Sequence, residues 1–302
     1  MDTQAPRRAQ TIAEFVPLIG RMFVDEERDR ALAAYRPRPT DVIISPFGKC
    51  GTTWLQQTFH CLRTRGDMDF DDISRAVPWI ETSVMLGIDI NAEQKANPRG
   101  FKSHLGYDEL PKGARYVVSL RDPKDALVSM YRFMEGWFIE PGTVAIGQFA
   151  FGWAMNARYW RHLKSWWAQR DNPDVLLFSY EHMCADPKSH VERLAKFCGI
   201  ALDEKLLALT LDHSSIAFML KHKDKFDDLL MRRKSEERCK LPPGSDSAKV
   251  RKGGIGGHHG ILPPEAGAML DQKWESEAAA ATGFASYQEL ESALRKRSAR
   301  RA

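Results

Sequence analysis

The chain has 302 residues, 43% of them apolar and 28% charged, which is enough for one large α/β domain or two small ones. Its net charge of +4 is too small to indicate nucleic-acid binding, and no stretch approaches the ~18 apolar residues of a membrane-spanning helix or contains the apolar core of a secretory signal. Five scattered cysteines without a C-x-x-C pair predict reduced thiols and a cytoplasmic location.

Short apolar runs alternate with helical patterns along the chain. Strands are predicted at 41–45, 100–103, 114–120 and 175–179, and helices at 55–65, 124–137, 148–169, 187–198, from Pro263-Pro264 onward and at 287–297. The strands lack a period-2 alternation and are separated by helices, which is typical of a parallel sheet with helices on both faces. We therefore predict a single α/β domain over residues 1–302.

The first strand runs into the segment Pro46-Phe47-Gly48-Lys49-Cys50-Gly51-Thr52-Thr53-Trp54, which leads into a helix. Unpaired N–H groups at a helix N-terminus and the helix dipole favour anions there. Lys49 adds a positive charge, and Thr52 and Thr53 add hydroxyl donors. This order predicts a phosphate-binding cradle; the alternative is a tight turn whose glycines only permit the backbone path.

The segment differs from the nucleoside-triphosphate loop G-x-x-x-x-G-K-[ST]. Cys50 follows Gly48-Lys49 where that loop has the serine or threonine that holds Mg²⁺, and Ile43 stands where it has its first glycine. We therefore predict phosphate binding without a metal. His258-His259 has no third or fourth ligand at a metal-site spacing, so no metal site is predicted.

Two further segments place cations at predicted strand ends. Arg121 follows the third strand, with Ser129 two turns into the next helix, and Lys102 and His104 end the second strand. Ligands of open parallel sheets bind beyond the carboxyl ends of the strands, so we expect Arg121 to bind a phosphate and His104 to be a candidate general base. The alternatives are a surface ion pair of Arg121 with Asp122 and a structural histidine.

The segment 240–260 is rich in lysine, proline and glycine and is not expected to form a regular core element. We predict a mobile surface loop or a lid that orders on a ligand. Within it, Arg251-Lys252-Gly253 suits a loop that folds over a phosphate, and a solvated basic loop is the alternative. The basic tail 295–302 is predicted to be a solvated, frayed end.

These motifs, in this order, resemble the cytosolic-type sulfotransferases that use 3′-phosphoadenosine 5′-phosphosulfate (PAPS) as donor. The family's P-K-S-G-T-T-W is similar to residues 48–54, its K-T-H to residues 102–104, its 3′-phosphate motif to residues 116–125 with Ser129, and its R-K-G to residues 251–253. The similarity runs from about residue 37 to residue 257. It implies a P-loop-like α/β fold and metal-free transfer of a sulfuryl group, which leaves 3′,5′-adenosine bisphosphate (PAP).

The resemblance assigns roles to individual residues. The 5′-phosphosulfate is expected to bind the residues of the first loop: Lys49, Gly51, Thr52 and Thr53. The adenine and its surroundings are expected to contact Trp54, Tyr180, Ser214 and Ser215. The 3′-phosphate is expected to bind Arg121, Ser129, Arg251, Lys252 and Gly253. His104 is implied to be the catalytic base, while Lys49 and Lys102 neutralise charge on the leaving and transferring groups.

Three differences from the family pattern stand out. After Arg251-Lys252-Gly253 the family continues to G-D-W-K, whereas this chain has Gly256-Gly257-His258-His259. Ile216 replaces an aromatic residue, and Phe47-Gly48 stands between Pro46 and Lys49. The short dimer motif of many animal members is not apparent, so no oligomeric state is predicted.

The acceptor is predicted to be a small aromatic or lipophilic molecule with a hydroxyl group, and an amine acceptor is left open. Its pocket is expected among apolar side chains: Trp79, Met85, Phe133, Met134, Trp137 and Phe138. Such a pocket suits a phenol, a sterol or a lipid alcohol, although aromatics at this spacing are more often core residues. Two other functions are the alternatives: an ATP- and Mg²⁺-dependent small-molecule kinase and a non-catalytic nucleotide-binding scaffold.

Overall fold

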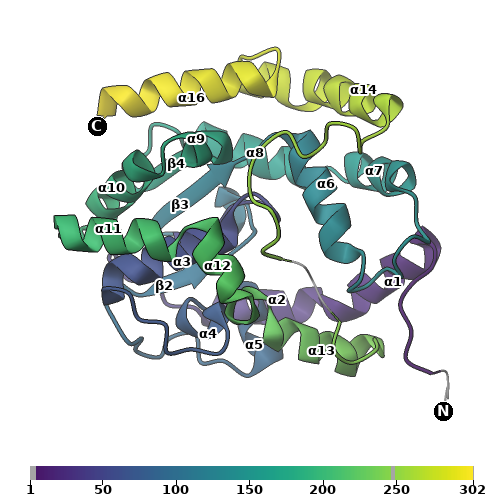
Figure 1. The fold of residues 1–302 in the computed structure, drawn as a ribbon, viewed down its shortest axis with the longest axis horizontal. Helices are drawn as coiled ribbons and strands as arrows, with labels where there is room; N and C mark the ends of the chain where they lie inside the picture. The colour runs from purple at the N-terminus through teal and green to yellow at the C-terminus, as the bar shows by residue number, and fades with distance from the viewer. Residues whose placement is uncertain (1–4, 246–248, 302) are drawn as a thin grey trace.

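The computed structural model describes residues 5–245 and 249–301 (Figure 1). At its centre lies a four-stranded parallel sheet with the strand order β2-β1-β3-β4. The strands are β1 (Val42–Ile44), β2 (Gly100–Lys102), β3 (Arg115–Leu120) and β4 (Val175–Ser179). Each strand lies where the sequence predicts one, so the parallel α/β fold is confirmed.

Helices cover both faces of the sheet (Figure 1). The α-helices are α1 (Ile12–Met22), α2 (Asp25–Ala34), α3 (Thr52–Thr64), α4 (Ile73–Ala76), α5 (Ser83–Leu86), α6 (Pro123–Met134), α7 (Ile146–Met155), α8 (Arg158–Ala168), α9 (Tyr180–Ala185), α10 (Pro187–Cys198), α11 (Glu204–His213), α12 (Ile216–Lys221), α13 (Leu229–Cys239), α14 (Pro264–Lys273), α15 (Ala280–Thr282) and α16 (Tyr287–Arg301). Short 3₁₀ segments are η1 (Ile80–Thr82), η2 (Tyr107–Glu109) and η3 (Lys223–Phe226), and η4 (Trp274–Ala279) is a π-helical turn. No described helix combines the length and the hydrophobicity needed to span a bilayer.

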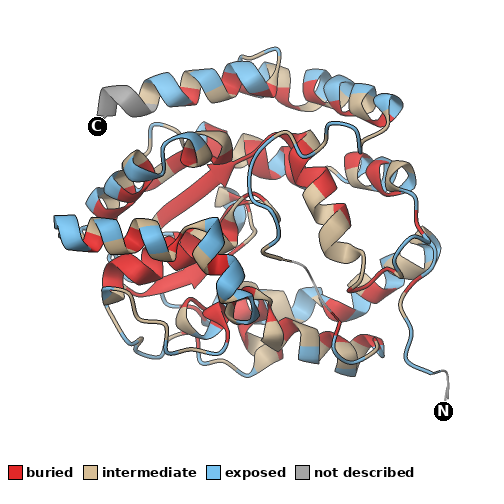
Figure 2. Cartoon of the chain, viewed as in Figure 1, coloured by how far each residue is buried: buried red, intermediate tan, exposed pale blue. Residues whose placement is uncertain are grey.

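Successive strand residues enter two different core layers, because side chains alternate between the faces of a sheet. Ile43 and Val118 pack in the layer formed with α6, α8, α14 and α16, whereas Val42 and Val117 pack in the layer formed with α3, α10 and α11. Figure 2 shows the strands buried along most of their length, and only Arg115 and Leu176 among their residues are partly exposed. The two layers hold the carboxyl ends of the strands in place as a platform for the loops that follow them.

The predicted long helix 148–169 is wrong, because the chain breaks between α7 and α8. Asn156 has an extended backbone (φ −79°, ψ 109°), and its side-chain Oδ1 accepts the N–H of Arg158 at 3.1 Å. An asparagine that bonds the backbone in this way competes with helical hydrogen bonding. The apolar pattern continues across the break, which is why periodicity alone did not reveal it.

The prediction of a frayed tail at 295–302 is also wrong for its described part, since α16 extends to Arg301. Leu294 is buried against the core, and Nη2 of Arg297 donates to the carbonyl of Arg170 at 3.0 Å. Residue 302 lies outside the described residues. The predicted late helix at Pro263-Pro264 is confirmed, with Pro263 as the N-cap of α14.

Candidate active site

The loops after β1, β2 and β3 open into one cavity of about 2020 Å³. All of the donor-binding, acceptor-binding and catalytic residues predicted from the sequence line this cavity. They come together because the carboxyl ends of parallel strands meet at the same edge of the sheet. The structure thus brings these side chains to one cavity, and the role of each one remains a prediction.

The loop before α3 has the backbone of an anion cradle. Gly51 is the N-cap of α3 with φ 97°, and a Cβ there would lie 3.0 Å from Cδ2 of Tyr180, so the position favours glycine. The hydroxyl of Ser119 on β3 donates to the carbonyl of Cys50, which ties the loop to the sheet. The hydroxyl of Thr52 is buried and has no hydrogen-bond partner among the described residues. A buried donor of this kind fits an anionic ligand.

Beyond the cradle, Trp54 and Tyr180 form an aromatic wall. Their ring centroids are 5.9 Å apart at 78°, and Nε1 of Trp54 has no partner in the described part of the chain. Ser214 and Ser215 also line this side, but Ser214 donates to the Thr210 carbonyl and Ser215 caps α12. The Ser214 hydroxyl has thus already donated its hydrogen, whereas Ser215 Oγ only accepts and keeps its hydrogen for another partner.

Arg121 is buried at the end of β3. Its Nη1 donates to the carbonyl of Lys49 at 2.8 Å, and its guanidinium lies 4.2 Å from the ring centroid of Tyr180. Asp122 instead caps α6 through the N–H of Lys124 and accepts from Gln288, so the alternative of an Arg121–Asp122 surface ion pair is wrong. Nε of Arg121 has no partner among the described atoms and, like the Thr52 hydroxyl, could bind an anion.

The imidazole of His104 has a fixed tautomer. Its Nδ1 lies 2.7 Å from the carbonyl oxygen of Pro46, which can only accept, so Nδ1 carries the proton and Nε2 keeps its lone pair. The backbone N–H of His104 donates to Oε1 of Glu81 at 2.8 Å. Burial, together with the charge of Lys102, lowers the pKa of His104 well below its usual value. The side chain therefore stays neutral at neutral pH, as a general base requires.

Two lysine amines reach the same space as His104. Nζ of Lys102 lies 4.1 Å from the ring centroid of Trp79, and the ring centroids of Trp79 and His104 are 5.0 Å apart. Nζ of Lys49 lies 4.2 Å from the ring centroid of Phe133. Burial, reinforced by neighbouring cations, lowers the pKa of Lys49 to about 7. Burial also lowers the pKa of Lys102 to about 8 although a neighbouring carboxylate opposes it. Such amines favour an anion that restores their charge.

The predicted acceptor residues form one apolar cluster that lines the cavity. Trp79, Met85, Phe133, Met134, Trp137 and Phe138 pack together with residues of α1 and α13. Trp137 and Phe138 are buried in the core and also line the cavity, and their contact with an acceptor stays a prediction. Sequence analysis did not find the contribution of α1, whose Phe15 and Ile19 complete the wall, because it carries no motif.

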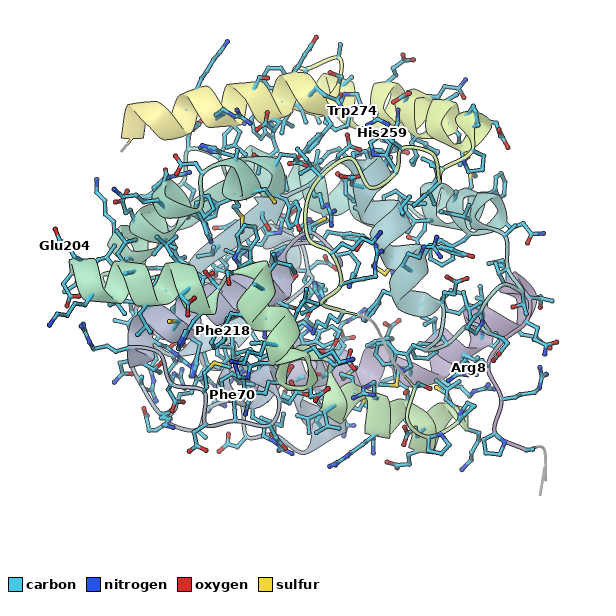
Figure 3. All side chains as sticks on the ribbon, in the orientation of Figure 1. Arg8, Phe70, Glu204, Phe218, His259 and Trp274 are labelled. Carbon is cyan, nitrogen blue, oxygen red and sulfur yellow. The ribbon has the colours of Figure 1, made fainter. Side chains whose placement is uncertain are left out.

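The described residues 249–260, here called the lid segment, contain no helix or strand, as predicted; residues 246–248 lie outside the described residues. Figure 1 shows this loop in front of the sheet on its way to α14, and Figure 3 labels its His259 at that side of the molecule. Asp125 of α6 anchors the segment by accepting the N–H of Gly256 at 2.7 Å and that of His258 at 3.0 Å. Nδ1 of His258 also lies 2.7 Å from Oδ1 of Asp125.

Comparison with known proteins decides the family of this chain. The model of the sulfotransferase domain family matches residues 39–283. The chain belongs to the sulfotransferase family. Sulfotransferase 1 family member D1 of Mus musculus is 30% identical over 70% of this chain and 76% of its own length. Cytosolic sulfotransferase 17 of Arabidopsis thaliana is 29% identical over 83% of this chain and 78% of its own.

Solved structures have the same fold as this sulfotransferase. Retinol dehydratase in complex with androsterone and the inactive cofactor PAP covers 90% of this chain and 96% of its own with a TM-score of 0.66 at 19% identity. The mouse sulfotransferase SULT7A1 complexed with PAP covers 91% of this chain and 95% of its own with a TM-score of 0.66 at 18% identity. The family match disfavours the kinase, because the matched domain is one of sulfuryl transfer.

Several residues of the sulfotransferase site were not found from the sequence. Glu81, Asp228 and Lys249 line the cavity, and Pro46 and Asp125 position His104 and the lid segment. Pro46 acts through its carbonyl, and Glu81, Asp228 and Lys249 stand outside the family's motifs, so no local signal marks them. Asp125 ends the 3′-phosphate motif, but the motif does not reveal its contacts with the lid segment. Within the described residues, no group of three or more His, Cys, Asp or Glu side chains is arranged to hold a metal ion.

The two perturbed lysines lead to an expected pH dependence of PAP binding. A bound anion stabilises protonated Lys49 and Lys102, whose pKa values are about 7 and about 8 without it. Binding of PAP at pH 8 should therefore take up protons. At pH values above the pKa of a lysine, that lysine should make Kd rise by up to ~10-fold per pH unit. Calorimetry from pH 6 to 9 in buffers of different ionisation enthalpy measures this. A pH-independent Kd without proton uptake would contradict it, and Lys49→Met should reduce the uptake.

Proposed function

We propose that this sulfotransferase moves the sulfuryl group of PAPS to a hydroxyl group of a small aromatic or lipophilic acceptor, with His104 as the general base. The observation that carries the proposal is the fixed tautomer of His104, whose Nε2 lone pair is available in a cavity lined by lysines and aromatic side chains. The retained base and lysines also disfavour the scaffold alternative, which needs none of them.

The donor would be held by loops at the strand ends, by the junction of α11 and α12, and by the lid segment. Lys49, Gly51, Thr52 and Thr53 form the cradle for the 5′-phosphosulfate, and Trp54 and Tyr180 flank the adenine together with Ser214 and Ser215. Arg121, Ser129, Arg251, Lys252 and Gly253 surround the 3′-phosphate. The buried Thr52 hydroxyl, Trp54 Nε1 and Arg121 Nε lack partners among the described residues, which supports a polar ligand along this path.

The transfer would be an in-line displacement at sulfur. The acceptor oxygen forms a bond to sulfur, the bond from sulfur to the bridging phosphate oxygen breaks, and Nε2 of His104 takes the hydroxyl proton while PAP leaves. Lys49 and Lys102 would neutralise the charge that develops on the leaving bridge and on the sulfuryl oxygens. The absence of a metal from this reaction stays a prediction, supported by Cys50 at the position of the Mg²⁺-binding hydroxyl.

The acceptor would lie against the apolar cluster of Trp79, Met85, Phe133, Trp137 and Phe138, which suits a small hydrophobic alcohol or phenol. No nucleic-acid partner is proposed. The cytoplasmic location also stays a prediction, and the relative named as a cytosolic sulfotransferase supports it.

The proposal is tested by calorimetric binding of PAP and of ADP, each with Mg²⁺ and with EDTA, followed by transfer of labelled sulfate from PAPS to phenols. We expect tight PAP binding that does not depend on Mg²⁺, and labelled sulfate esters as products. A preference for ADP with Mg²⁺ would overturn the proposal in favour of a kinase. Binding of PAP without transfer to any hydroxyl or amine acceptor would leave only a nucleotide-binding scaffold.

The contact between His258 and Asp125 makes the lid segment a testable part of the donor site. His258→Ala removes the side-chain bond to a carboxylate that is itself almost completely buried, which leaves the loop that carries Arg251 and Lys252 anchored by backbone contacts with Asp125. We expect Kd for PAP to rise about tenfold, the effect of one hydrogen bond to a charged group, by calorimetry. His259→Ala is the matched control, because this neighbouring imidazole is exposed, and it should change Kd less than about twofold.

Equal effects of the two histidine variants would contradict the anchoring role of His258. So would a His258→Ala variant that binds PAP normally, because the lid segment would then be held by its other contacts alone.

A further inference from the structure

The C-terminal helix α16 begins beyond residues 39–283, which the sulfotransferase domain model matches. Figure 1 shows this helix beside α9 at one edge of the molecule. Two side chains of its first turn, the buried Tyr287 and its neighbour Gln288, reach towards the turn after β3. Neither residue lines the cavity or takes part in the proposed transfer. Their contacts nevertheless lead, through two carboxylates, to Arg121, the residue assigned to the 3′-phosphate.

Tyr287 reaches the turn through the carboxylate of Glu181. Its hydroxyl donates to Oε2 of Glu181 at 2.6 Å, and Oε1 of Glu181 accepts the backbone N–H of Asp122 at 3.0 Å. Burial raises the pKa of Glu181, and these two hydrogen bonds oppose the rise because they stabilise the ionised form. The carboxylate therefore bridges the start of α16 to the residue that follows Arg121.

Gln288 holds the same turn through the side chain of Asp122. Its Nε2 donates to Oδ2 of Asp122 at 2.8 Å, while Oδ1 of Asp122 accepts the N–H of Lys124 and caps α6. The hydroxyl of Tyr159 on α8 donates to the carbonyl of Arg121 at 2.6 Å. The peptide group after Arg121 and the side chain that follows it are thus held by residues of α8, α9 and α16.

The same helix also supports the ring against which the Arg121 side chain lies. Ser179, the N-cap of α9, donates its hydroxyl to Oε1 of Glu291 on α16 at 3.1 Å. The next residue is Tyr180, whose ring centroid lies 4.2 Å from the Arg121 guanidinium. α16 therefore contacts both the turn that carries the guanidinium and the turn that carries its aromatic neighbour.

A phosphate site depends on such support, because a guanidinium binds a phosphate through a planar fork whose donors have fixed directions. A small displacement of the turn would misalign Nε of Arg121, which has no partner among the described residues. The cradle for the 5′-phosphosulfate has its own tie to the sheet, the hydrogen bond from Ser119 to the carbonyl of Cys50. Loss of the α16 contacts should therefore affect the 3′-phosphate more than the 5′-phosphate.

We propose that Tyr287 and Gln288 are positioning residues of the donor site, which hold the Arg121 turn and so give the C-terminal helix a part in the selection of nucleotides with a 3′-phosphate. This assignment rests on the proposed function, which gives Arg121 its role. Tyr287 and Gln288 act through Glu181 and Asp122 and do not touch the nucleotide.

The test uses the full chain with the double variant Tyr287→Phe/Gln288→Ala, which removes both hydrogen bonds and keeps the buried ring. Kd for PAP, measured by calorimetry, should rise about tenfold, the effect of a hydrogen bond to a charged group. Kd for adenosine 5′-monophosphate, which lacks the 3′-phosphate, should change less than about twofold. KM for PAPS should rise with Kd for PAP while kcat stays within about twofold, because His104 and the two lysines are not displaced.

Tyr116→Phe and Glu289→Ala are the matched controls. The buried Tyr116 hydroxyl donates to the carbonyl of Pro111 in the same core layer as Tyr287 and does not line the cavity. Glu289 is an exposed neighbour of Gln288 on α16. Tyr116→Phe should lower the thermal stability as Tyr287→Phe does, but both controls should keep the wild-type ratio of the two Kd values. This ratio separates positioning of Arg121 from a general loss of stability.

Three results would overturn the inference while leaving the proposed function intact. These are a double variant with the wild-type Kd for PAP, equal weakening of PAP and adenosine 5′-monophosphate, and a Tyr116→Phe variant whose Kd ratio changes as much as that of the double variant. Failure of the proposed function gives a different result, namely a wild type that prefers ADP with Mg²⁺ or transfers no sulfate from PAPS, and the inference would fall with it.

Discussion

Replacing His104 with alanine is expected to lower kcat for sulfate transfer by about 10²- to 10⁴-fold, the usual contribution of a general base. The expectation follows from the Pro46 carbonyl, which binds Nδ1 and leaves Nε2 unprotonated and free to take the acceptor proton. Because His104 is assigned to proton transfer and not to the donor, Kd for PAP should change less than about threefold. Steady-state kinetics with PAPS and a phenol, together with calorimetry, separate these two quantities.

The pH profile gives a second readout of the same assignment. The neutral imidazole is the active form, and the pKa of His104 is lowered mainly by burial, so activity should persist on acidification to well below pH 6.5. His222→Ala, which removes an imidazole that does not line the cavity, should leave kcat unchanged. A His104→Ala variant that keeps more than about a tenth of the wild-type kcat would contradict the assignment.

Much of the fold could be predicted from the sequence, because its signals are local. The four strands are short apolar runs without alternation, and each strand was placed within one residue of its observed ends. The break at Asn156 was missed, since a single side-chain hydrogen bond to the N–H of Arg158 overrides a helical pattern that continues on both sides. The helix predicted at 287–297 includes the buried Leu294 and was correct, but its extension to Arg301 was missed, because the basic tail was expected to fray.

The residues of the candidate site could be predicted where a motif directly follows a strand. They could not be predicted where a side chain reaches the cavity from a distant loop. Lys49, His104 and Arg121 could be brought together from the sequence, since parallel strands end at one edge of the sheet. Asp228 directly precedes α13, and Lys249 follows it in the lid segment. Only the tertiary fold therefore brings their charges to Lys102. The carbonyl of Pro46 carries no side-chain signal at all.

Replacing Arg121 with alanine should weaken PAP binding by about 100-fold, or about 2.7 kcal/mol, because a buried guanidinium makes charge-assisted hydrogen bonds to a phosphate. The side chain is already oriented, with Nη1 on the Lys49 carbonyl and the guanidinium on the Tyr180 ring. Arg121→Lys keeps the charge but loses the planar fork, so its Kd should lie between those of the wild type and Arg121→Ala.

A second nucleotide distinguishes phosphate binding from support of the loop. Adenosine 5′-monophosphate lacks the 3′-phosphate, so Arg121→Ala should hardly affect its Kd if the guanidinium binds that group. Kd is measured for both nucleotides with both the wild type and the variant. Most of the 100-fold loss should then appear as coupling between Arg121 and the 3′-phosphate. Arg132→Ala is the matched control, since Arg132 lines the cavity but is paired with Glu135. Equal weakening of both nucleotides would instead mean that Arg121 acts by holding the Lys49 loop, because that contact is the same whichever nucleotide binds.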